Sequence, residues 1–279
     1  MKLVLVSLCC LGALGSLTAA YEPLELNYHE RVGIPRAQAV LQAELAPDFD
    51  GSRIISGTPA ALGQYPYMAG QIMTLANGGQ SIGGGTLISN TKVLTAAHNL
   101  FDGRQMVRHV TVVLGSIRVF TGGTRITSDR MELHGNYDVN RIMNDIAIIT
   151  INWVNYSNTI RNIGLASGSN TYAGAWAWAI GFGKTSDAAP ASPDLMHARV
   201  QVITNEACRN SFSGNMIVES TLCISGATGN ICTGDSGGPL VSNNLLIGVS
   251  SFGSGSCDTR RPSGFARVSS FNSWIRARM

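Results

Sequence analysis

The sequence has few charged residues and almost no lysine, and both shortages restrict what the chain can do. Charged residues make up 13% of the 279 residues, and 32 residues are glycine, which predicts a compact, turn-rich β protein. Only Lys2, Lys92 and Lys184 are lysines among the 20 basic residues. Arginine stays charged where lysine begins to lose its proton, so an alkaline working environment and a bias of the lineage both remain open explanations. No basic run is interleaved with aromatic residues, so we expect no nucleic-acid partner.

Long apolar runs are also lacking after the first 20 residues. Residues 1–20 begin with the positive charge of Lys2, continue with a short apolar stretch and end in the small residues Thr18, Ala19 and Ala20. This order is typical of a secretory signal peptide, and the apolar run is shorter than the ~20 residues that a membrane-spanning helix needs. We therefore expect a secreted, extracellular protein that is not held in a membrane.

Cysteine is scarce, and neither a CxxC nor an HxxxH pair occurs. Those absences argue against a zinc site, and we expect neither a metal nor a cofactor. Of the 6 cysteines, Cys9 and Cys10 belong to the signal peptide. The others are Cys208, Cys223, Cys232 and Cys257. An even number in an oxidising compartment predicts two disulfides, with three connectivities open at this point.

The remainder of the chain divides into a polar segment and one large domain. Residues 21–53 contain three prolines, no cysteine and no strand-like alternation; they resemble a propeptide with one short helix over residues 37–45. Residues 54–279 contain short apolar runs separated by turn residues, which predicts an all-β sandwich or barrel. The expected strands include residues 86–88, 92–95, 110–114, 146–151, 175–180, 199–203, 245–249 and 264–268. Residues 270–279 carry Phe271, Trp274 and Ile275 at helical spacing, which predicts a C-terminal helix.

The most informative stretch is Gly234-Asp235-Ser236-Gly237-Gly238-Pro239. Glycine adopts backbone angles that a side chain forbids, and proline interrupts strand pairing, so the stretch predicts a tight turn that presents the Ser236 hydroxyl. A glycine-rich turn with an inert serine is the simpler alternative. A nucleophilic serine requires a base within hydrogen-bond reach and a third group that orients the base.

Two other stretches supply candidates for these groups. His98 ends the run Thr95-Ala96-Ala97-His98, and Asp145 precedes the apolar residues 146–149. A carboxylate at the start of an apolar strand is costly to bury unless it is hydrogen-bonded. Each feature alone has a structural explanation, as a strand-end histidine or a capping acid, but the three together predict a proton-transfer chain.

These three stretches resemble the active-site signatures of the chymotrypsin-like serine proteases. The propeptide-like segment and the run Phe101-Asp102-Gly103 look most like those of insect digestive chymotrypsins. The resemblance covers residues 54–279, and it implies two six-stranded antiparallel β-barrels with the active site between them. It implies Ser236 as the nucleophile, His98 as the general base and Asp145 as the residue that orients His98. It also implies an oxyanion hole formed by the backbone N–H groups of Gly234 and Ser236.

The same resemblance assigns further roles. Ser251 matches the serine that hydrogen-bonds the aspartate of the triad. Arg53 precedes Ile54, which resembles the new N-terminus of an activated protease, and the freed amine of Ile54 would pair with Asp235. An activating trypsin-like protease is therefore an expected partner.

Substrate preference follows from the positions that match the S1 pocket. These positions are Asn230, Ile231, Gly253 and Ser263. None of them is acidic, so we expect cleavage after bulky apolar residues and not after arginine or lysine. Because Ile231 narrows the pocket, an elastase-like preference for small residues is the alternative.

One departure from the family is that Gly83 and Asn99 occupy the positions of a common disulfide near the catalytic histidine. The resemblance leaves Cys208–Cys223 and Cys232–Cys257 as the expected pairs. The missing cross-link predicts a looser loop around His98. Separately, Asn155 lies in an Asn-Tyr-Ser sequon, which is a candidate glycosylation site.

The leading interpretation is a secreted, monomeric digestive endopeptidase of the gut lumen, made as a zymogen. Its expected partners are protein or peptide substrates and protein protease inhibitors. A non-catalytic relative that acts as a binding protein is the alternative from another class, although such relatives usually lose the histidine or the serine. A regulatory cascade protease would normally carry a cysteine-rich N-terminal module, and because residues 21–53 contain no cysteine we favour a digestive role.

Overall fold

The computed structural model describes residues 27–46, 58–184, 186–188, 191–212, 215–229, 231, 235–253 and 256–279. The predicted signal peptide, Arg53 and Ile54, and the site residues Asn230, Cys232 and Gly234 lie outside the described residues.

The N-terminal half of the described domain forms a seven-stranded sheet in which all neighbours are antiparallel. Its order is β6 (Thr124–Ser128), β5 (Val107–Leu114), β2 (Met68–Leu75), β3 (Gln80–Ser89), β4 (Lys92–Thr95), β8 (Ala147–Thr150) and β7 (Met131–Leu133). Only residues 129 and 130 separate β6 from β7. The Ser128 hydroxyl and the Arg130 carbonyl both bond the backbone of Thr150 in β8, so the segment from β6 to β7 brings the two ends of this strand order together.

The C-terminal half forms the second sheet, which has eight strands. Its order is β1 (Thr58–Pro59), β11 (Met196–Ile203), β10 (Trp176–Gly181), β13 (Pro239–Ser242), β14 (Leu245–Phe252), β15 (Ser263–Arg267) and β12 (Thr221–Ile224). The short strand β9 (Gly164–Leu165) pairs with β14 in parallel. An additional pairing of β11 with β12 closes six of these strands into a ring.

One of the two expected six-stranded barrels is therefore the ring in the C-terminal sheet, and β1 and β9 are additional short strands that pair with β11 and β14 of this ring. The N-terminal sheet differs in its count because β6 and β7 are separate segments. One cluster of buried, mostly aliphatic side chains lies within the N-terminal sheet, and a larger one contains residues of both sheets. Burial of such side chains is the main favourable term in folding, at about 1.5–3 kcal/mol for each large one.

Helices are few in the described residues. They are a π-helical turn at His29–Gly33, α1 (Ile34–Leu45), a 3₁₀ turn at Ala97–Asn99, α2 (Asn205–Arg209) and α3 (Val268–Arg276). The predicted C-terminal helix is thus present but begins at Val268, and it buries Val268, Phe271 and Ile275. The helix predicted over residues 37–45 is one turn longer at its start. In the described part of the chain, no helix is both long and apolar enough to cross a membrane.

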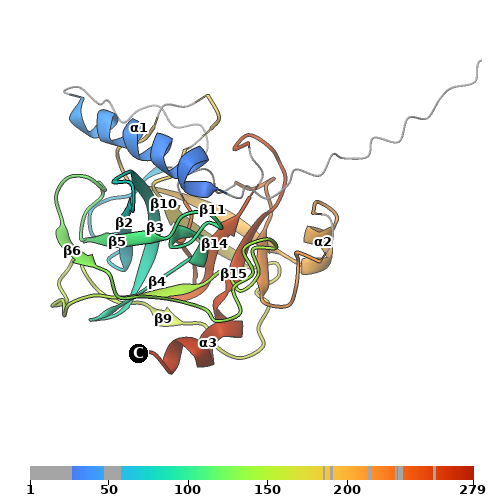
Figure 1. The fold of residues 1–279 in the computed structure, drawn as a ribbon. Coiled ribbons are helices and arrows are strands. Elements are labelled where there is room, and N and C mark those ends of the chain that lie inside the picture. Colours follow the sequence, from blue (N-terminus) through green and yellow to red (C-terminus); the bar gives the residue numbers. More distant parts are fainter. Residues whose placement is uncertain are drawn as a thin grey trace, which may run out of the picture.

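Figure 1 shows α1, in blue, lying across one end of the molecule beside the strands β2, β3 and β10. The segment expected to be a propeptide is therefore packed on the protease-like domain. The C-terminal helix α3 lies at the opposite end of the molecule.

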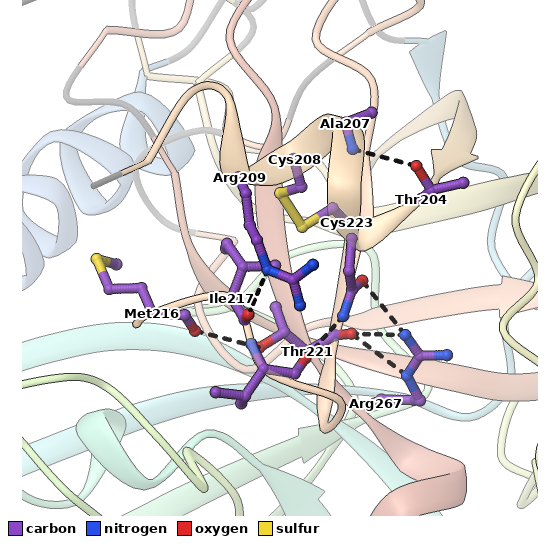
Figure 2. The surroundings of a disulfide bond; sticks show 11 residues. Thr204, Ala207, Cys208, Arg209, Met216, Ile217, Thr221, Cys223 and Arg267 are labelled. Atoms are coloured by element: carbon purple, nitrogen blue, oxygen red, sulfur yellow. Dashed lines mark hydrogen bonds between the residues drawn. A yellow bond between two sulfur atoms is a disulfide. The ribbon is translucent and has the colours of Figure 1, made fainter. Parts of the chain in front are cut away.

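The disulfide Cys208–Cys223 joins α2 to β12 (Figure 2). Thr204 caps α2 by accepting a hydrogen bond from the Ala207 N–H at 3.1 Å, and the Arg267 guanidinium donates to the Thr221 carbonyl at 2.7 Å. The Cys208–Cys223 bond confirms one of the two expected disulfide pairs. Cys257 is also disulfide-bonded, and its expected partner Cys232 lies outside the described residues.

Candidate active site

Three predicted site residues meet where the two sheets face each other. Asp145 is 1% exposed, and its carboxylate accepts the His98 backbone N–H at 2.8 Å and faces His98 Nδ1 at 2.7 Å. The Ser251 hydroxyl donates to the same carboxylate at 2.5 Å. Because an ionised carboxylate only accepts hydrogen bonds, Nδ1 of a neutral His98 carries the proton and Nε2 is left as the acceptor.

The local sequence explains how these side chains converge. Strand β4 ends at Thr95, and the 3₁₀ turn after it carries His98. Asp145 lies two residues before β8, which pairs with β4. Ser251 belongs to β14 of the other sheet. The arrangement therefore depends on both sheets, and it compensates the buried carboxylate with three donors.

The loop that carries Ser236 is fixed by close backbone packing. Gly237 has a φ of 78°, and a Cβ at this position would lie 2.3 Å from Thr95 Oγ1 and 2.4 Å from the Gly84 carbonyl oxygen. Glycine is therefore required there. The Ser236 carbonyl accepts the Gly84 N–H at 2.8 Å. Among the described residues, no backbone carbonyl accepts the Ser236 N–H; Gly234, the other predicted oxyanion donor, lies outside them.

Tyr28 makes a contact with His98 and Ser236 that the sequence did not predict. No hydrogen bond joins the His98 and Ser236 side chains within the described part of the chain. Instead, the ring of Tyr28 packs edge-on against the His98 ring at a centroid distance of 5.1 Å. Burial raises the pKa of Tyr28 to about 12, and a hydrogen bond with the Ser236 side chain partly opposes that rise. The Tyr28 hydroxyl also donates to the Ile82 carbonyl at 3.1 Å.

Hydrogen bonds occupy the place of the missing disulfide. A Cβ on Gly83 would lie 2.7 Å from Asn99 Nδ2, so the two positions are adjacent, as the resemblance implied. Asn99 is fully buried, and its Nδ2 donates to the Ser236 carbonyl at 3.0 Å and to Thr95 Oγ1 at 3.2 Å. The residue after the predicted base is thus bonded directly to the backbone of the predicted nucleophile. The only sequence signal for this link was the simultaneous loss of both cysteines.

Three of the predicted S1 residues lie together. A Cβ on Gly253 would lie 3.1 Å from Ser263 Oγ and 4.0 Å from the Ile231 carbonyl oxygen. Ser263 and Ile231 are buried, at 0% and 9% exposure. The described wall of this site thus holds small or apolar groups, while Asn230 lies outside the described residues.

The remaining predicted residues are placed as follows. The Asp235 carboxylate accepts the Gly183 N–H at 2.8 Å; its predicted partner Ile54 lies outside the described residues. Asn155 is exposed in the segment between β8 and β9, where a sequon is accessible. In the described part of the chain, no group of three or more metal-ligating side chains is found.

Comparisons with known proteins agree with this geometry. Residues 54–275 match the protein-family model described as Trypsin. The chain is 38% identical over 230 residues to a collagenase of Hypoderma lineatum, covering 80% of this chain and 86% of that protein. It is 34% identical over 235 residues to trypsin delta of Drosophila melanogaster, covering 83% and 90%. The solved structure of HL collagenase superimposes with a TM-score of 0.74 at 38% identity, covering 81% of this chain and 98% of that one.

Proposed function

This chain belongs to the trypsin family of serine endopeptidases, and we propose that it is a secreted enzyme made as a zymogen, with residues 54–279 as the mature form and a preference for bulky apolar P1 residues. The observation that carries the proposal is the buried carboxylate of Asp145, which binds both His98 and Ser251 beside the loop of Ser236.

The proposed mechanism assigns one step to each group. His98 Nε2 takes the proton of Ser236 as its oxygen attacks the substrate carbonyl, and the imidazolium that forms is stabilised by Asp145. The proton then passes to the leaving amine, and an acyl-enzyme remains on Ser236. Water, activated by the same histidine, releases the acid product. The N–H groups of Gly234 and Ser236 stabilise the oxyanion, and loss of one such donor costs about 2.7–4 kcal/mol of barrier.

Substrate preference is proposed from the S1 positions. The relative named trypsin delta and this chain share the family, but Asn230 places no negative charge at the position where the family reads arginine or lysine. Ile231, Gly253 and Ser263, which lie close together, are uncharged. We therefore assign a chymotrypsin-like preference for Phe, Tyr, Leu or Met, with an elastase-like preference as the second candidate, in which Ile231 narrows the pocket.

Activation is proposed to follow cleavage after Arg53 by a trypsin-like protease. The family match begins at residue 54, which supports this boundary. The new amine of Ile54 then pairs with Asp235, next to the Ser236 loop. We propose protein substrates in a digestive setting such as the gut lumen for a secreted, monomeric protease, and protein protease inhibitors as further partners.

The experiment uses the full precursor, activated with trypsin that is then removed. We expect one equivalent of a serine-reactive phosphonate to label the protein, and kcat/KM on a panel of peptides to be highest for Phe, Tyr, Leu or Met at P1. The Ser236→Ala variant is the control and should neither label nor cleave. Collagen belongs in the panel because of the 38% identical collagenase. Correctly cut protein that neither labels nor cleaves would identify the chain as a non-catalytic relative.

A further inference from the structure

Residues 27–46 cover the catalytic side chains of the domain that they precede. We propose that this segment is an intramolecular inhibitor, which blocks the active site sterically, and that it inhibits the mature enzyme until it dissociates after cleavage. The inference rests on the proposed protease function and adds how the precursor is kept silent.

The blocking group is Tyr28. Its ring contacts His98, its hydroxyl bonds the Ile82 carbonyl, and Ser236 is hydrogen-bonded to it. It is only 8% exposed. A substrate carbonyl must come within about 3–3.5 Å of the nucleophile before attack. The Tyr28 side chain occupies that approach, so the segment and a substrate cannot both be bound.

The turn beside Tyr28 is held by a preformed acceptor. The Asp102 carboxylate receives the N–H groups of Arg104 and Gln105 from its own loop, at 3.0 and 2.8 Å. It also receives the N–H of His29, at 3.0 Å. Burial would raise the pKa of the Asp102 carboxyl, but these backbone hydrogen bonds hold it below its usual value. The domain thus offers an ionised group to the backbone of the segment.

The helix α1 is anchored at both ends by groups of opposite charge. Near its start, Arg36 Nη2 donates to the Phe182 carbonyl at 2.6 Å, and the residue is 3% exposed. Burial lowers the pKa of Arg36 to about 10, and the negative charge of Asp235 opposes that change. Near its end, the Glu44 carboxylate accepts the N–H groups of Val119 and Phe120, both at 2.9 Å. Charged partners make these bonds about twice as strong as neutral ones.

The face between the anchors is apolar and closely fitted. Ala37 and Val40 are 2% and 0% exposed and belong to the same buried cluster as residues of both sheets. A Cβ on Gly33 would lie 1.8 Å from Ser81 Oγ and 2.9 Å from Ser81 Cβ, so the segment approaches β3 as closely as glycine permits. A segment that was merely a linker would not bury charged, apolar and backbone groups in this way.

The connection to the domain explains how cutting relieves the blockade. Residues 47–57 connect this segment to the domain in sequence, and covalent connection through a short stretch of chain keeps a bound module at an effective concentration on the order of mM. Residues 21–53 contain no cysteine, so no disulfide retains the segment after cleavage at Arg53. Its occupancy then depends on its own concentration, which falls on dilution.

The first test measures amide hydrogen exchange of the full precursor before and after cleavage at Arg53. We expect residues 27–46 and the N–H groups of Val119 and Phe120 to be protected in the intact chain. All of them should exchange faster once the cut protein is diluted. Exchange of residues 27–46 at the rate of an unstructured chain in the intact precursor overturns the inference and leaves the proposed protease function untouched.

The second test adds a synthetic peptide of residues 27–46 to the mature enzyme after the trypsin has been removed. We expect competitive inhibition and slower phosphonate labelling of Ser236. Tyr28→Ala and Gly33→Ala peptides should be at least about 10-fold weaker, since one loses the blocking ring and the other collides with Ser81. Gln42→Ala, on the exposed side of α1, is the matched control and should inhibit like the parent. An active enzyme that 1 mM peptide neither inhibits nor protects in the exchange experiment contradicts the proposal.

The pH dependence of peptide binding provides a third, independent test of how the segment binds. His29 is fully buried, and neither ring nitrogen has a hydrogen-bond partner among the described residues. Burial lowers the pKa of His29 to about 4; the charge of Asp102 opposes this and that of His98 adds to it. Since the free residue titrates near 6.5, binding is strongest above that pH and weakens as the pH falls towards 4.

We expect affinity, read by fluorescence anisotropy of labelled peptide, to fall at least about 10-fold between pH 8 and pH 5. A His29→Gln peptide, which has no titrating ring, should lose most of this dependence. Equal pH dependence of the two peptides would show that His29 is not buried in the complex, and would overturn the binding mode.

Discussion

In the C-terminal sheet a covalent bond, Cys208–Cys223, joins α2 to β12, whereas in the N-terminal sheet the loop of His98 is joined to its surroundings by the hydrogen bonds of Asn99. A disulfide acts mainly by restricting the unfolded chain, while a hydrogen bond contributes only when the native geometry is present. The disulfide therefore stabilises the fold even when the groups around it shift slightly. The Asn99 hydrogen bonds, in addition, fix the position of the Ser236 backbone relative to the residue next to His98.

The buried amides of the N-terminal half are not fully satisfied. Asn99 Oδ1 and Gln71 Nε2 have no partner among the described residues. A buried polar atom without a partner costs about 1–3 kcal/mol. We therefore expect the half that carries His98 to open more readily than the half that carries the Cys208–Cys223 disulfide, although both contribute to one site.

Asp145→Asn should have the largest effect because this residue connects the two halves. It binds His98 from one sheet and Ser251 from the other. An amide in place of the carboxylate favours the wrong tautomer of His98, and in the trypsin family that change lowers kcat on the order of 10⁴-fold. Steady-state kinetics of the activated enzyme measures this, and an unchanged denaturation midpoint shows that the fold is retained. A kcat within 10-fold of the parent would show that Asp145 does not orient the base.

Replacing both cysteines, Cys208→Ala with Cys223→Ala, should remove the covalent bond between α2 and β12 in the C-terminal half. The two residues are 15 apart in sequence, and a loop of that length is worth about 3 kcal/mol in the chain-entropy model. Urea denaturation of the activated enzyme measures the loss, while kcat/KM at 25 °C should change little because the disulfide lies outside the catalytic contacts. If kcat/KM fell in proportion to stability, the disulfide would have a direct part in positioning the site.

How much of this was visible in the sequence depended on whether the signal was local. The run before His98, the Ser236 motif and the strand over residues 92–95 are local, and the structure has β4 at Lys92–Thr95. We named no strand for β2, Met68–Leu75, because nearly all of its residues are buried. A strand buried on both faces shows no alternation, and a central glycine weakens its propensity.

Contacts between distant segments were beyond prediction. A short helix over residues 37–45 followed from composition, but nothing in residues 27–46 indicated that Tyr28 would reach His98, or that Glu44 would bind the N–H groups of Val119 and Phe120. These contacts depend on tertiary packing and not on periodicity. His197 illustrates the same limit: the residue is 9% exposed and its ring stacks on Trp178 at a centroid distance of 4.8 Å, across a contact that the sequence does not signal.

Introducing the family's cross-link into the N-terminal half, by Gly83→Cys with Asn99→Cys, should make the two halves more alike. The new loop is close in length to the existing one, so the gain in the chain-entropy model is again about 3 kcal/mol. The loss of the Asn99 hydrogen bonds subtracts about 1 kcal/mol, which leaves a net gain of about 2 kcal/mol. Thiol titration shows whether the bond forms, and urea denaturation with and without reductant measures its contribution. Equal stability in both conditions would mean that the hydrogen bonds already do as much as the covalent bond.

Asn99→Ala should have the smallest effect on stability and be the most informative about position. It removes the donor to the Ser236 carbonyl, but that oxygen keeps the Gly84 N–H at 2.8 Å, so the loss should be only about 1 kcal/mol. If the hydrogen bond also positions the nucleophile, kcat should fall several-fold while KM stays constant, because the Ser236 loop is displaced and the S1 residues are not. The double cysteine variant lacks the same hydrogen bond but has a covalent substitute, and should recover kcat. If Asn99→Ala lost stability without a change in kcat, Asn99 would be a purely structural link. The Asn99 hydrogen bonds and the Cys208–Cys223 disulfide would then both stabilise the fold, and neither would position the catalytic groups.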